Sequence, residues 1–215
     1  MQLIILDTNS ESVRYLSEKD KRLARVIETV GTISYEPYYD DPYAFLVHEI
    51  IEQMLSIKAG ARIYERLEDL CGGAVTPPTI SALSDDAIRS TGTSNAKVSY
   101  IRSLTYAITE GSIDLDFLAN LCDDEIIKKL TSIRGIGNWS AKMFLIFVLN
   151  RPDILPFEDG AFLQTYRWMY KTEDSRPQVV TEKCKKWSPY SSIAARYLYR
   201  ALDMGLTKEE FHIFS

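Results

Sequence analysis

Two closely spaced glycines between apolar segments constrain the fold of this chain more than any other feature. Gly135 and Gly137 separate an apolar-periodic segment that ends at Leu130 from another that starts near Trp139. Glycine tolerates the positive φ angles of a tight turn and lets another backbone approach closely. The run therefore predicts a helix, a hairpin and a second helix. A hairpin that leads into a helix N-terminus directs amide N–H groups outward, so it is a candidate phosphate site.

The remaining sequence predicts an all-α protein. Asp41-Pro42 provides an N-cap and a first-turn proline for a helix over 43–57. Strands are expected only near the N-terminus, at 1–6 and 32–38, and residues 1–40 are expected to pack with the C-terminal helices. Further helices are expected at 60–70, 96–109, 112–121, 124–130, 139–149 and 159–170. Others are expected to start at Ser84 and after a cap at Ser188-Pro189, and a last turn is expected with a capping box of Thr207 and Glu210. Residues 172–180 are expected to form a loop.

Composition limits the classes of protein to consider. The 215 residues are 46% hydrophobic, enough for one or two compact domains. No stretch approaches the roughly 20 apolar residues of a membrane span, and the first six residues do not resemble a signal peptide. The cysteines lack the spacing of an iron–sulfur or metal site, so a cytoplasmic protein without a required cofactor is expected. They are Cys71, Cys122 and Cys184.

The net charge of −5 argues against a general nucleic-acid coat, although a specific DNA enzyme needs only a basic face. Two groups of basic residues are candidates for such a face, and solvated helix surfaces balanced by nearby acids are the alternative. The groups are Lys128, Lys129, Arg134 and Lys142 around the hairpin, and Lys183, Lys185 and Lys186 further on.

Two adjacent carboxylates follow the hairpin segment in the run Leu155-Pro-Phe-Glu-Asp159. Either Glu158 or Asp159 could supply an acid close to the phosphate site, and the residues alone do not separate them. An ordinary acid at a helix N-terminus is the alternative interpretation.

Several ordered motifs between Tyr43 and Arg200 resemble the helix-hairpin-helix (HhH-GPD) DNA glycosylases, specifically their 3-methyladenine branch. Besides the hairpin, the resemblance rests on the helical run from Tyr43 to Ala59 and on Gly92-Thr-Ser-Asn-Ala-Lys-Val-Ser-Tyr-Ile101. It continues in Arg151-Pro-Asp-Ile-Leu-Pro156 with Asp159, and in Trp187-Ser-Pro-Tyr190.

The resemblance implies two helical subdomains flanking a DNA-binding cleft, 43–150 ending in the helix-hairpin-helix at 124–149, and 1–42 with 151–215. By the same resemblance, N–H groups near Gly135, Gly137 and Ser140 would hold a DNA phosphate, with Lys142 nearby. The family's hairpin carbonyls can also bind a structural monovalent cation. The matching positions are Thr131, Ile133 and Ile136.

The family pattern puts the essential aspartate three residues after the proline, which selects Asp159. Such a carboxylate would stabilise the positive charge that builds on the sugar and would orient or deprotonate the attacking water. The family usually continues Asp-Leu-Gly, whereas this chain reads Asp159-Gly-Ala-Phe162. A slightly shifted helix start is therefore expected.

Trp139 stands where bifunctional glycosylase–lyases carry a nucleophilic lysine, which implies a monofunctional enzyme that uses water. An aromatic face attracts a cationic alkylated purine by about 0.5–2 kcal/mol, so Trp139 is expected in the base pocket; core packing is its alternative role. Trp187 and Tyr190 match further family positions in the pocket. Ser188 and Ser191 stand where arginines are common.

Gln53 and Met54 fall where the family presents residues to the gap left by a flipped nucleotide. An inserted apolar wedge would partly offset the lost stacking, and a core position is the alternative for Met54.

These expectations combine into a monomeric base-excision-repair enzyme that acts on damaged double-stranded DNA, without a membrane. It would hydrolyse the glycosidic bond of alkylated purines of the 3-methyladenine and 7-methylguanine type after flipping the nucleotide. It would lie with the nucleoid in a prokaryote or in the nucleus of a eukaryote. The alternatives are a glycosylase for oxidised, deaminated or mismatched bases and a non-catalytic helix-hairpin-helix DNA-binding protein.

Overall fold

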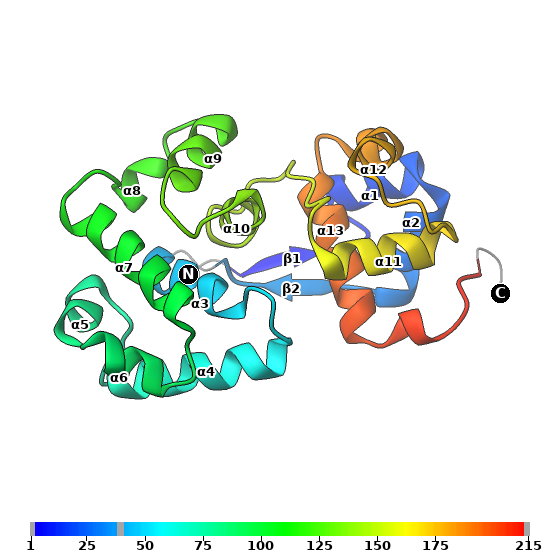
Figure 1. Ribbon diagram of the computed structural model, residues 1–215. Helices are drawn as coiled ribbons and strands as arrows, with labels where there is room; N and C mark the ends of the chain where they lie inside the picture. The colour runs from blue at the N-terminus through cyan, green and yellow to red at the C-terminus, as the bar shows by residue number, and fades with distance from the viewer. Residues whose placement is uncertain (1–2, 38–40, 213–215) are drawn as a thin grey trace. The chain divides into compact units, whose positions relative to one another are not determined.

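The chain divides into two compact units in the computed structural model, which describes residues 3–37 and 41–212. The central unit is Tyr38–Leu149, and the terminal unit combines Met1–Pro37 with Asn150–Ser215. The division expected from the sequence, 43–150 against 1–42 with 151–215, has the same order and bounds close to these. Both units are built mainly from helices, as predicted (Figure 1).

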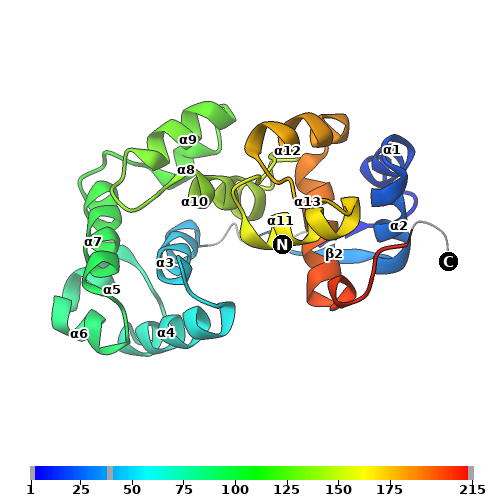
Figure 2. The same cartoon turned by 45° about the vertical axis from the view of Figure 1, so that its right-hand side comes forward.

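The central unit is a cluster of helices around α3. Figure 2 shows α3 among α4, α7 and α10, and each of these helices contacts it. Its core consists of apolar side chains from α3, α7, α9 and the hairpin helices, including Ile50, Ile101 and Phe144. The elements are α3 (Pro42–Glu52), α4 (Ile57–Leu70), α5 (Pro77–Ala82), α6 (Asp85–Ser90), α7 (Asn95–Thr109), α8 (Leu115–Leu118), α9 (Asp123–Thr131) and α10 (Asn138–Met143), which continues as the π-helical η1 (Phe144–Val148).

The predicted helix over 43–57 starts as expected but ends early. Asp41 accepts a hydrogen bond from the N–H of Ala44 at 2.9 Å, and a proline occupies the first turn. The helix stops at Glu52, Met54 adopts a φ of +60°, and a second helix begins at Ile57. The cap of this second helix is the Ser56 hydroxyl, which accepts from Ala59. The prediction of one continuous helix was therefore wrong at residues 53–56.

The terminal unit joins a small antiparallel sheet to helices from both ends of the chain. β1 (Ile4–Leu6) pairs with β2 (Ile33–Tyr35), so that Ile4 faces Tyr35, and both strands lie within the segments predicted as strands. Residues 1, 2 and 38 of those segments lie outside the described residues. The other elements are α1 (Glu11–Lys19), α2 (Lys21–Val30), α11 (Gly160–Tyr170), α12 (Pro177–Cys184), η2 (Lys185–Trp187), α13 (Ser191–Asp203) and η3 (Leu206–Lys208).

The core of the terminal unit mixes both segments, which confirms the expected packing with the C-terminal helices for the described residues 3–37. Helix α2 contacts both α11 and α13. Leu16 and Leu23 are fully buried together with Tyr166, Tyr197 and Leu198. The hydroxyl of Tyr197 also donates to the Leu6 carbonyl at 3.2 Å, which links α13 to β1.

Several local predictions were wrong. Pro177 does not mark a loop but occupies the first turn of α12, where its missing N–H has no helical partner in any case. Ser188-Pro189, a cis peptide, does not cap a helix, since α13 begins at Ser191. Thr207 lies inside η3 instead of preceding a turn. The helix expected at 112–121 shortens to Leu115–Leu118, and α5 adds a short helix that was not expected.

The three cysteines are free thiols, with Cys122 exposed, Cys71 half-buried and Cys184 buried. Burial raises the pKa of the Cys184 thiol well above its ordinary value. Among the described helices, none has the length and apolar character needed to cross a bilayer.

Candidate DNA-binding and catalytic site

The two hairpin glycines have different physical roles. Gly135 has a φ of +97°, and a Cβ at this position would lie 2.2 Å from Cγ and 2.3 Å from Cβ of Tyr100. Gly137 has a φ of −99°, and a Cβ there would meet no atom within 4 Å. Gly135 is therefore required by the shape of the turn and its packing, whereas Gly137 keeps the outer surface of the hairpin open.

Gly137 is also the N-cap of α10, and it supplies no side chain to cap the first turn. The N–H of Ala141 bonds to the Gly137 carbonyl at 3.0 Å. The first-turn N–H groups have no such partner within a helix. Ser140 is only 1% exposed, so any phosphate contact of this residue would come from its backbone N–H and not from its hydroxyl. Lys142 and Trp139 are half-buried on the same helix.

Residues 53–56, here called the wedge loop, connect α3 to α4 beside the hairpin. Met54 at its tip is fully exposed (101%), and Leu55 is 41% exposed. The Gln53 side chain turns back instead, and its Nε2 donates to the Gly135 carbonyl at 2.9 Å and approaches Oγ of Ser140 at 3.4 Å. The structure thus brings together Gln53, Gly135 and Ser140 and leaves Met54 standing outward, which excludes the core position considered for Met54.

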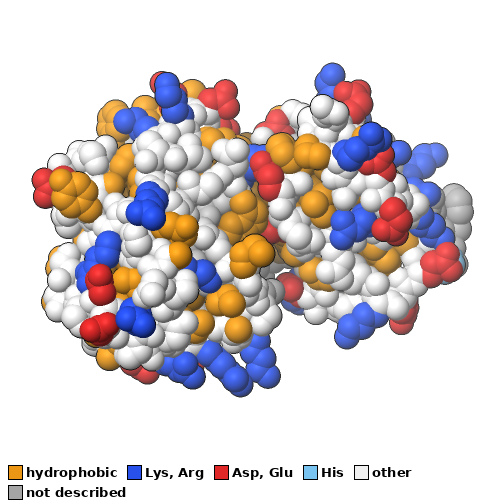
Figure 3. All heavy atoms as spheres, viewed as in Figure 1, with side chains coloured by type: hydrophobic (Ala, Val, Ile, Leu, Met, Phe, Trp, Pro, Cys, Tyr) orange, Lys and Arg blue, Asp and Glu red, His pale blue; other side chains and the backbone are white. Residues whose placement is uncertain are grey.

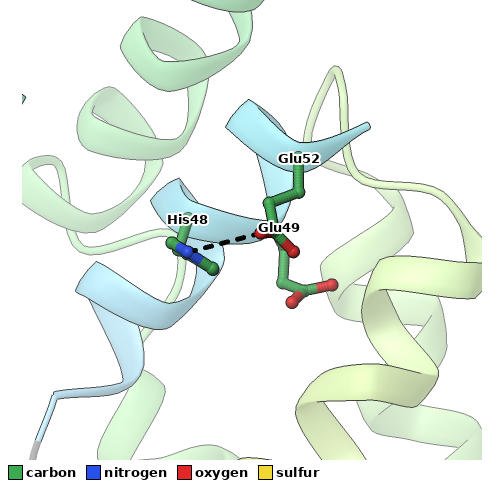
Figure 4. A group of neighbouring side chains, drawn as sticks. All are labelled: His48, Glu49 and Glu52. Atoms are coloured by element: carbon green, nitrogen blue, oxygen red, sulfur yellow. Dashed lines mark ion pairs between the residues drawn. The ribbon is translucent and has the colours of Figure 1, made fainter. Parts of the chain in front are cut away.

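The last turn of α3 carries a histidine and two glutamates (Figure 4). His48 Nε2 lies 3.6 Å from Oε1 of Glu52, one helical turn on, and both belong with Glu49 to a group whose ligand atoms lie within 4.8 Å of one another. In Figure 4 the Glu49 carboxylate points away from His48. Glu52 also covers Gly60, where a Cβ would lie 2.7 Å from its Cγ. Glu52 therefore packs closely against α4 at the base of the wedge loop.

Basic side chains continue from the wedge loop along α4. Lys58 and Arg62 are exposed and lie one helical turn apart, so they share a face of the helix. Figure 3 shows lysine and arginine side chains gathered at the edge of the central unit where α4 runs. Near the hairpin, Lys128, Lys129 and Arg134 are exposed as well. The central unit thus carries a local basic surface despite the negative net charge.

Asp159 is the N-cap of α11 in the terminal unit. Its Oδ1 accepts the N–H of Phe162 at 2.7 Å, and the residue is only 8% exposed, whereas Glu158 is exposed. The carboxylate therefore caps the first turn of α11 and lies at the positive end of the helix dipole. The unusual Asp-Gly-Ala-Phe sequence therefore begins the helix directly after the aspartate, and Gly160 has open space around it.

The segment that leads to Asp159 is fastened to the start of α13 by Asp153. Its carboxylate accepts hydrogen bonds from the Ser188 hydroxyl and from the hydroxyl and N–H of Ser191, the latter two at 2.6 and 3.1 Å. Ser192 adds bonds to the backbone of Pro152 and Ile154. The two serines that stand where arginines are common in the family thus hold the loop before the candidate catalytic acid.

Trp187 lies in the core of the terminal unit, and this location does not fit the base-pocket role predicted for it. It is 0% exposed, and its indole N–H donates to the buried Asp20 at 3.0 Å. Its ring packs edge to face against that of Phe162, with the ring centroids 6.3 Å apart, so it contacts α11 from within the core. Tyr190 is half-buried and packs edge to face against Tyr15.

Three structurally important residues were not identified from the sequence. Lys97 and Tyr100 of α7 contact the wedge loop and the hairpin, respectively, and Asp153 holds the loop before Asp159. Their side chains act over long sequence separations, which local patterns do not report. All three residues lie in family-like motifs quoted above, and the i, i+3 spacing of Lys97 and Tyr100 places both side chains on one face of a helix.

A glycine hairpin between two helices, with an aspartate that caps a helix of a second helical unit, defines a helix-hairpin-helix protein. The chain belongs to the HhH-GPD superfamily of base excision DNA repair proteins, whose sequence profile matches residues 47–189.

Among curated proteins, the chain is 30% identical over 194 residues to DNA-3-methyladenine glycosylase 1 of Schizosaccharomyces pombe, covering 86% of this chain and 84% of the relative. Among solved structures, it is similar to a DNA-3-methyladenine glycosidase of Bacillus halodurans, with 34% identity, a TM-score of 0.83 and coverage of 98% and 97%. A 3-methyladenine DNA glycosylase of Schizosaccharomyces pombe in complex with abasic DNA also has a TM-score of 0.83, with 28% identity and coverage of 90% and 97%.

Proposed function

We propose that this protein is a monofunctional DNA glycosylase that removes alkylated purines from duplex DNA. The observation that carries the proposal is the buried Asp159 at the N-terminus of α11, in a chain whose hairpin and wedge loop have the features needed to hold and open DNA. The similarity to proteins named 3-methyladenine glycosylases supports this substrate class.

DNA binding is assigned to the hairpin and its surroundings. The first-turn N–H groups of α10 and the side chain of Lys142 would meet a phosphate. The carbonyls of Thr131, Ile133 and Ile136 would hold a monovalent cation. Thr131 ends α9, where helix carbonyls have no intrahelical donor, and the Ile133 carbonyl also accepts the N–H of Ile136 at 3.1 Å. Such an ion would add positive charge close to the phosphate.

Extrusion of the damaged nucleotide is assigned to the wedge loop. Met54 is fully exposed at its tip and would fill the space that the flipped base leaves. Flipping costs a few kcal/mol, and it costs least for a base that is already damaged and poorly paired. Selection of alkylated bases would therefore begin before any contact with the catalytic acid.

The chemistry needs one carboxylate and water. In the reaction, a water oxygen forms a bond to C1′ of the sugar, and the glycosidic bond breaks with its electron pair passing to the base. A cationic base such as 7-methylguanine leaves as a neutral molecule, so no strong general acid is required. Asp159 would stabilise the positive charge on the sugar and take the proton of the attacking water.

Two aromatic residues remain candidates for the base pocket. Trp139 and Tyr190 are half-buried, and each could offer a face to a cationic base. Because Trp139 carries no amine, no Schiff base can form at this position, and we infer that strand cleavage does not accompany base release.

The test is release of 3-methyladenine and 7-methylguanine from methylated duplex DNA by the purified protein. Asp159→Asn keeps a side chain that can cap α11, so it is expected to fold and bind DNA while losing release. Glu158→Gln is the matched control and should retain activity. Full activity of Asp159→Asn would refute the catalytic role of Asp159. A lack of base release from any damaged DNA would refute the glycosylase function.

Borohydride trapping tests the monofunctional assignment. A covalent protein–DNA adduct would overturn it, whereas absence of an adduct in a preparation that releases bases would support it. A substrate panel that includes oxidised and deaminated bases checks the lesion class, and sedimentation of the free protein checks the proposed monomer.

A further inference from the structure

Lys97 of helix α7 holds the wedge loop through hydrogen bonds to its backbone and to the end of α3. The Nζ of Lys97 donates to the carbonyl of Ile51 at 2.7 Å and to the carbonyl of Gln53 at 2.6 Å. Both carbonyls lie at the C-terminal end of α3, where a helix leaves its last acceptors without N–H partners. A cation is also favoured at this end of the helix dipole. Lys97 therefore closes α3 at the point where the wedge loop begins.

This lysine is partly removed from solvent. It is half-buried, and burial lowers the pKa of its amine from the ordinary value. A long cationic side chain normally extends into water. Here it is directed to two backbone carbonyls instead, so its position is determined by the loop that it supports.

Met54 has a backbone conformation that needs such support. Its φ of +60° is uncommon for a residue with a side chain. Strained conformations of this kind persist only where the surroundings hold them. The carbonyl of the preceding residue, Gln53, is one of the two acceptors of Lys97, so the support acts immediately before Met54.

The same helix also supports the hairpin. Tyr100, one turn after Lys97 on α7, packs against Gly135 so closely that no Cβ fits there. Gln53 then joins the two loops directly, through its hydrogen bond to the Gly135 carbonyl. One face of α7 thus fixes the wedge loop and the hairpin at a set spacing within the central unit.

We propose that Lys97 is a positioning residue for base flipping: it holds the wedge loop in place so that Met54 can enter the duplex without prior rearrangement. This inference rests on the proposed glycosylase function. Preorganisation of this kind lowers the cost of reaching the inserted state, because the loop does not have to be ordered when DNA binds. Lys97 contacts no reacting atom in this scheme.

The test compares excision from two forms of the same methylated DNA. Single-turnover release of 7-methylguanine is measured at saturating protein from duplex DNA and from heat-denatured DNA, in which the base does not have to leave a duplex. Lys97→Met keeps the length of the side chain and removes the donors. It is expected to slow release from the duplex by about tenfold, equivalent to about 1.4 kcal/mol, and to change release from denatured DNA much less.

Four further variants complete the design. Met54→Ala should show the same duplex-selective loss, and the double variant should be no slower than Met54→Ala alone, because both changes disable one step. Lys97→Arg retains charge and donors and should preserve most of the duplex activity. Lys208→Met removes an exposed lysine of the terminal unit and should leave both rates unchanged.

The outcomes separate the two proposals. Wild-type protein that releases no base refutes the glycosylase function itself. An active wild type with an unaffected Lys97→Met, or with equal losses on both DNA forms, refutes the positioning role. If circular dichroism shows that Lys97→Met is unfolded, Lys97→Arg decides the question. Retained duplex activity in Lys97→Arg supports the positioning role, and a duplex-selective loss in Lys97→Arg as large as that of Met54→Ala would overturn it.

Discussion

Replacement of Gly135 by alanine tests whether the hairpin depends on one glycine more than on the other. The positive φ of Gly135 is unfavourable for alanine by about 1–2 kcal/mol. The new methyl group would also overlap Cβ and Cγ of Tyr100 at 2.3 and 2.2 Å. Because these atoms are at the root of the Tyr100 side chain, rotation cannot remove the overlap, and overpacking adds about 1–3 kcal/mol. The expected local destabilisation is about 2–5 kcal/mol.

Gly137→Ala is the matched control. Its φ of −99° suits alanine, and no atom lies within 4 Å of the added Cβ. Loss of glycine from the unfolded chain and the poorer N-cap act in opposite directions, so the change should stay within about 1 kcal/mol.

Hydrogen exchange followed by mass spectrometry measures this difference in the hairpin peptides without assuming that the two units unfold together. Gly135→Ala should accelerate exchange over residues 123–143 by at least about thirtyfold, whereas Gly137→Ala should leave it nearly unchanged. Adding Tyr100→Ala to Gly135→Ala should recover only the part of the steric cost that comes from Cγ and the ring, since the Cβ of residue 100 remains at 2.3 Å. Equal exchange in the two alanine variants would refute the distinct roles of the glycines.

Three other features give direct expectations. Burial acts to raise the pKa of Asp20, but hydrogen bonds from Tyr170, Lys186 and Trp187 outweigh it and lower the pKa. The contribution of the ionised Asp20 to the free energy of unfolding should therefore be complete above pH about 4 and be lost as pH falls through the lowered pKa. The difference in Tm between wild type and Asp20→Asn should therefore shrink on acidification, and a constant difference would contradict this. A thiol reagent should modify Cys122 quickly and Cys184 only after unfolding, since the first is exposed and the second buried; labelling of Cys184 in the native protein would contradict that assignment. Met54→Ala should leave Tm nearly unchanged because the side chain is fully exposed, and a large fall would show that it packs within the fold.

Much of the helical layout followed from local sequence, because caps and apolar periodicity act over only a few residues. Asp41-Pro42 and Ser84 began helices where predicted, and α7 and α11 lie close to their expected ranges. The short strands were also located near the N-terminus as expected. These features need no information from distant parts of the chain.

The interruption of α3 at residues 53–56 could not be predicted in the same way. Apolar residues continue through Met54 to Ile57, so the pattern alone favours one helix. The break is stabilised by Lys97, whose two acceptors lie 44 and 46 residues earlier in the chain. A contact of this sequence separation depends on the assembled fold.

The location of Trp187 was misjudged for a similar reason. Its match to a family motif favoured a place in the base pocket. Its partner is Asp20, 167 residues away, which lies at the N-terminus of α2 and takes up the indole N–H. The role of Asp159 rested on the family spacing, and the structure adds its burial and its capping bond to that argument.

The discontinuous terminal unit has a consequence for synthesis of the protein on the ribosome. Residues 38–149 are contiguous, so the central unit can complete its contacts as soon as it has emerged. The first 37 residues must wait, because the helices that cover them, α11 and α13, are translated later. During this interval the nascent chain would already present the hairpin and the wedge loop while the segment containing Asp159 is still missing. A nascent chain from which residues 38–149 have emerged, but not Asp159, would thus display the proposed DNA-binding loops without the proposed catalytic acid.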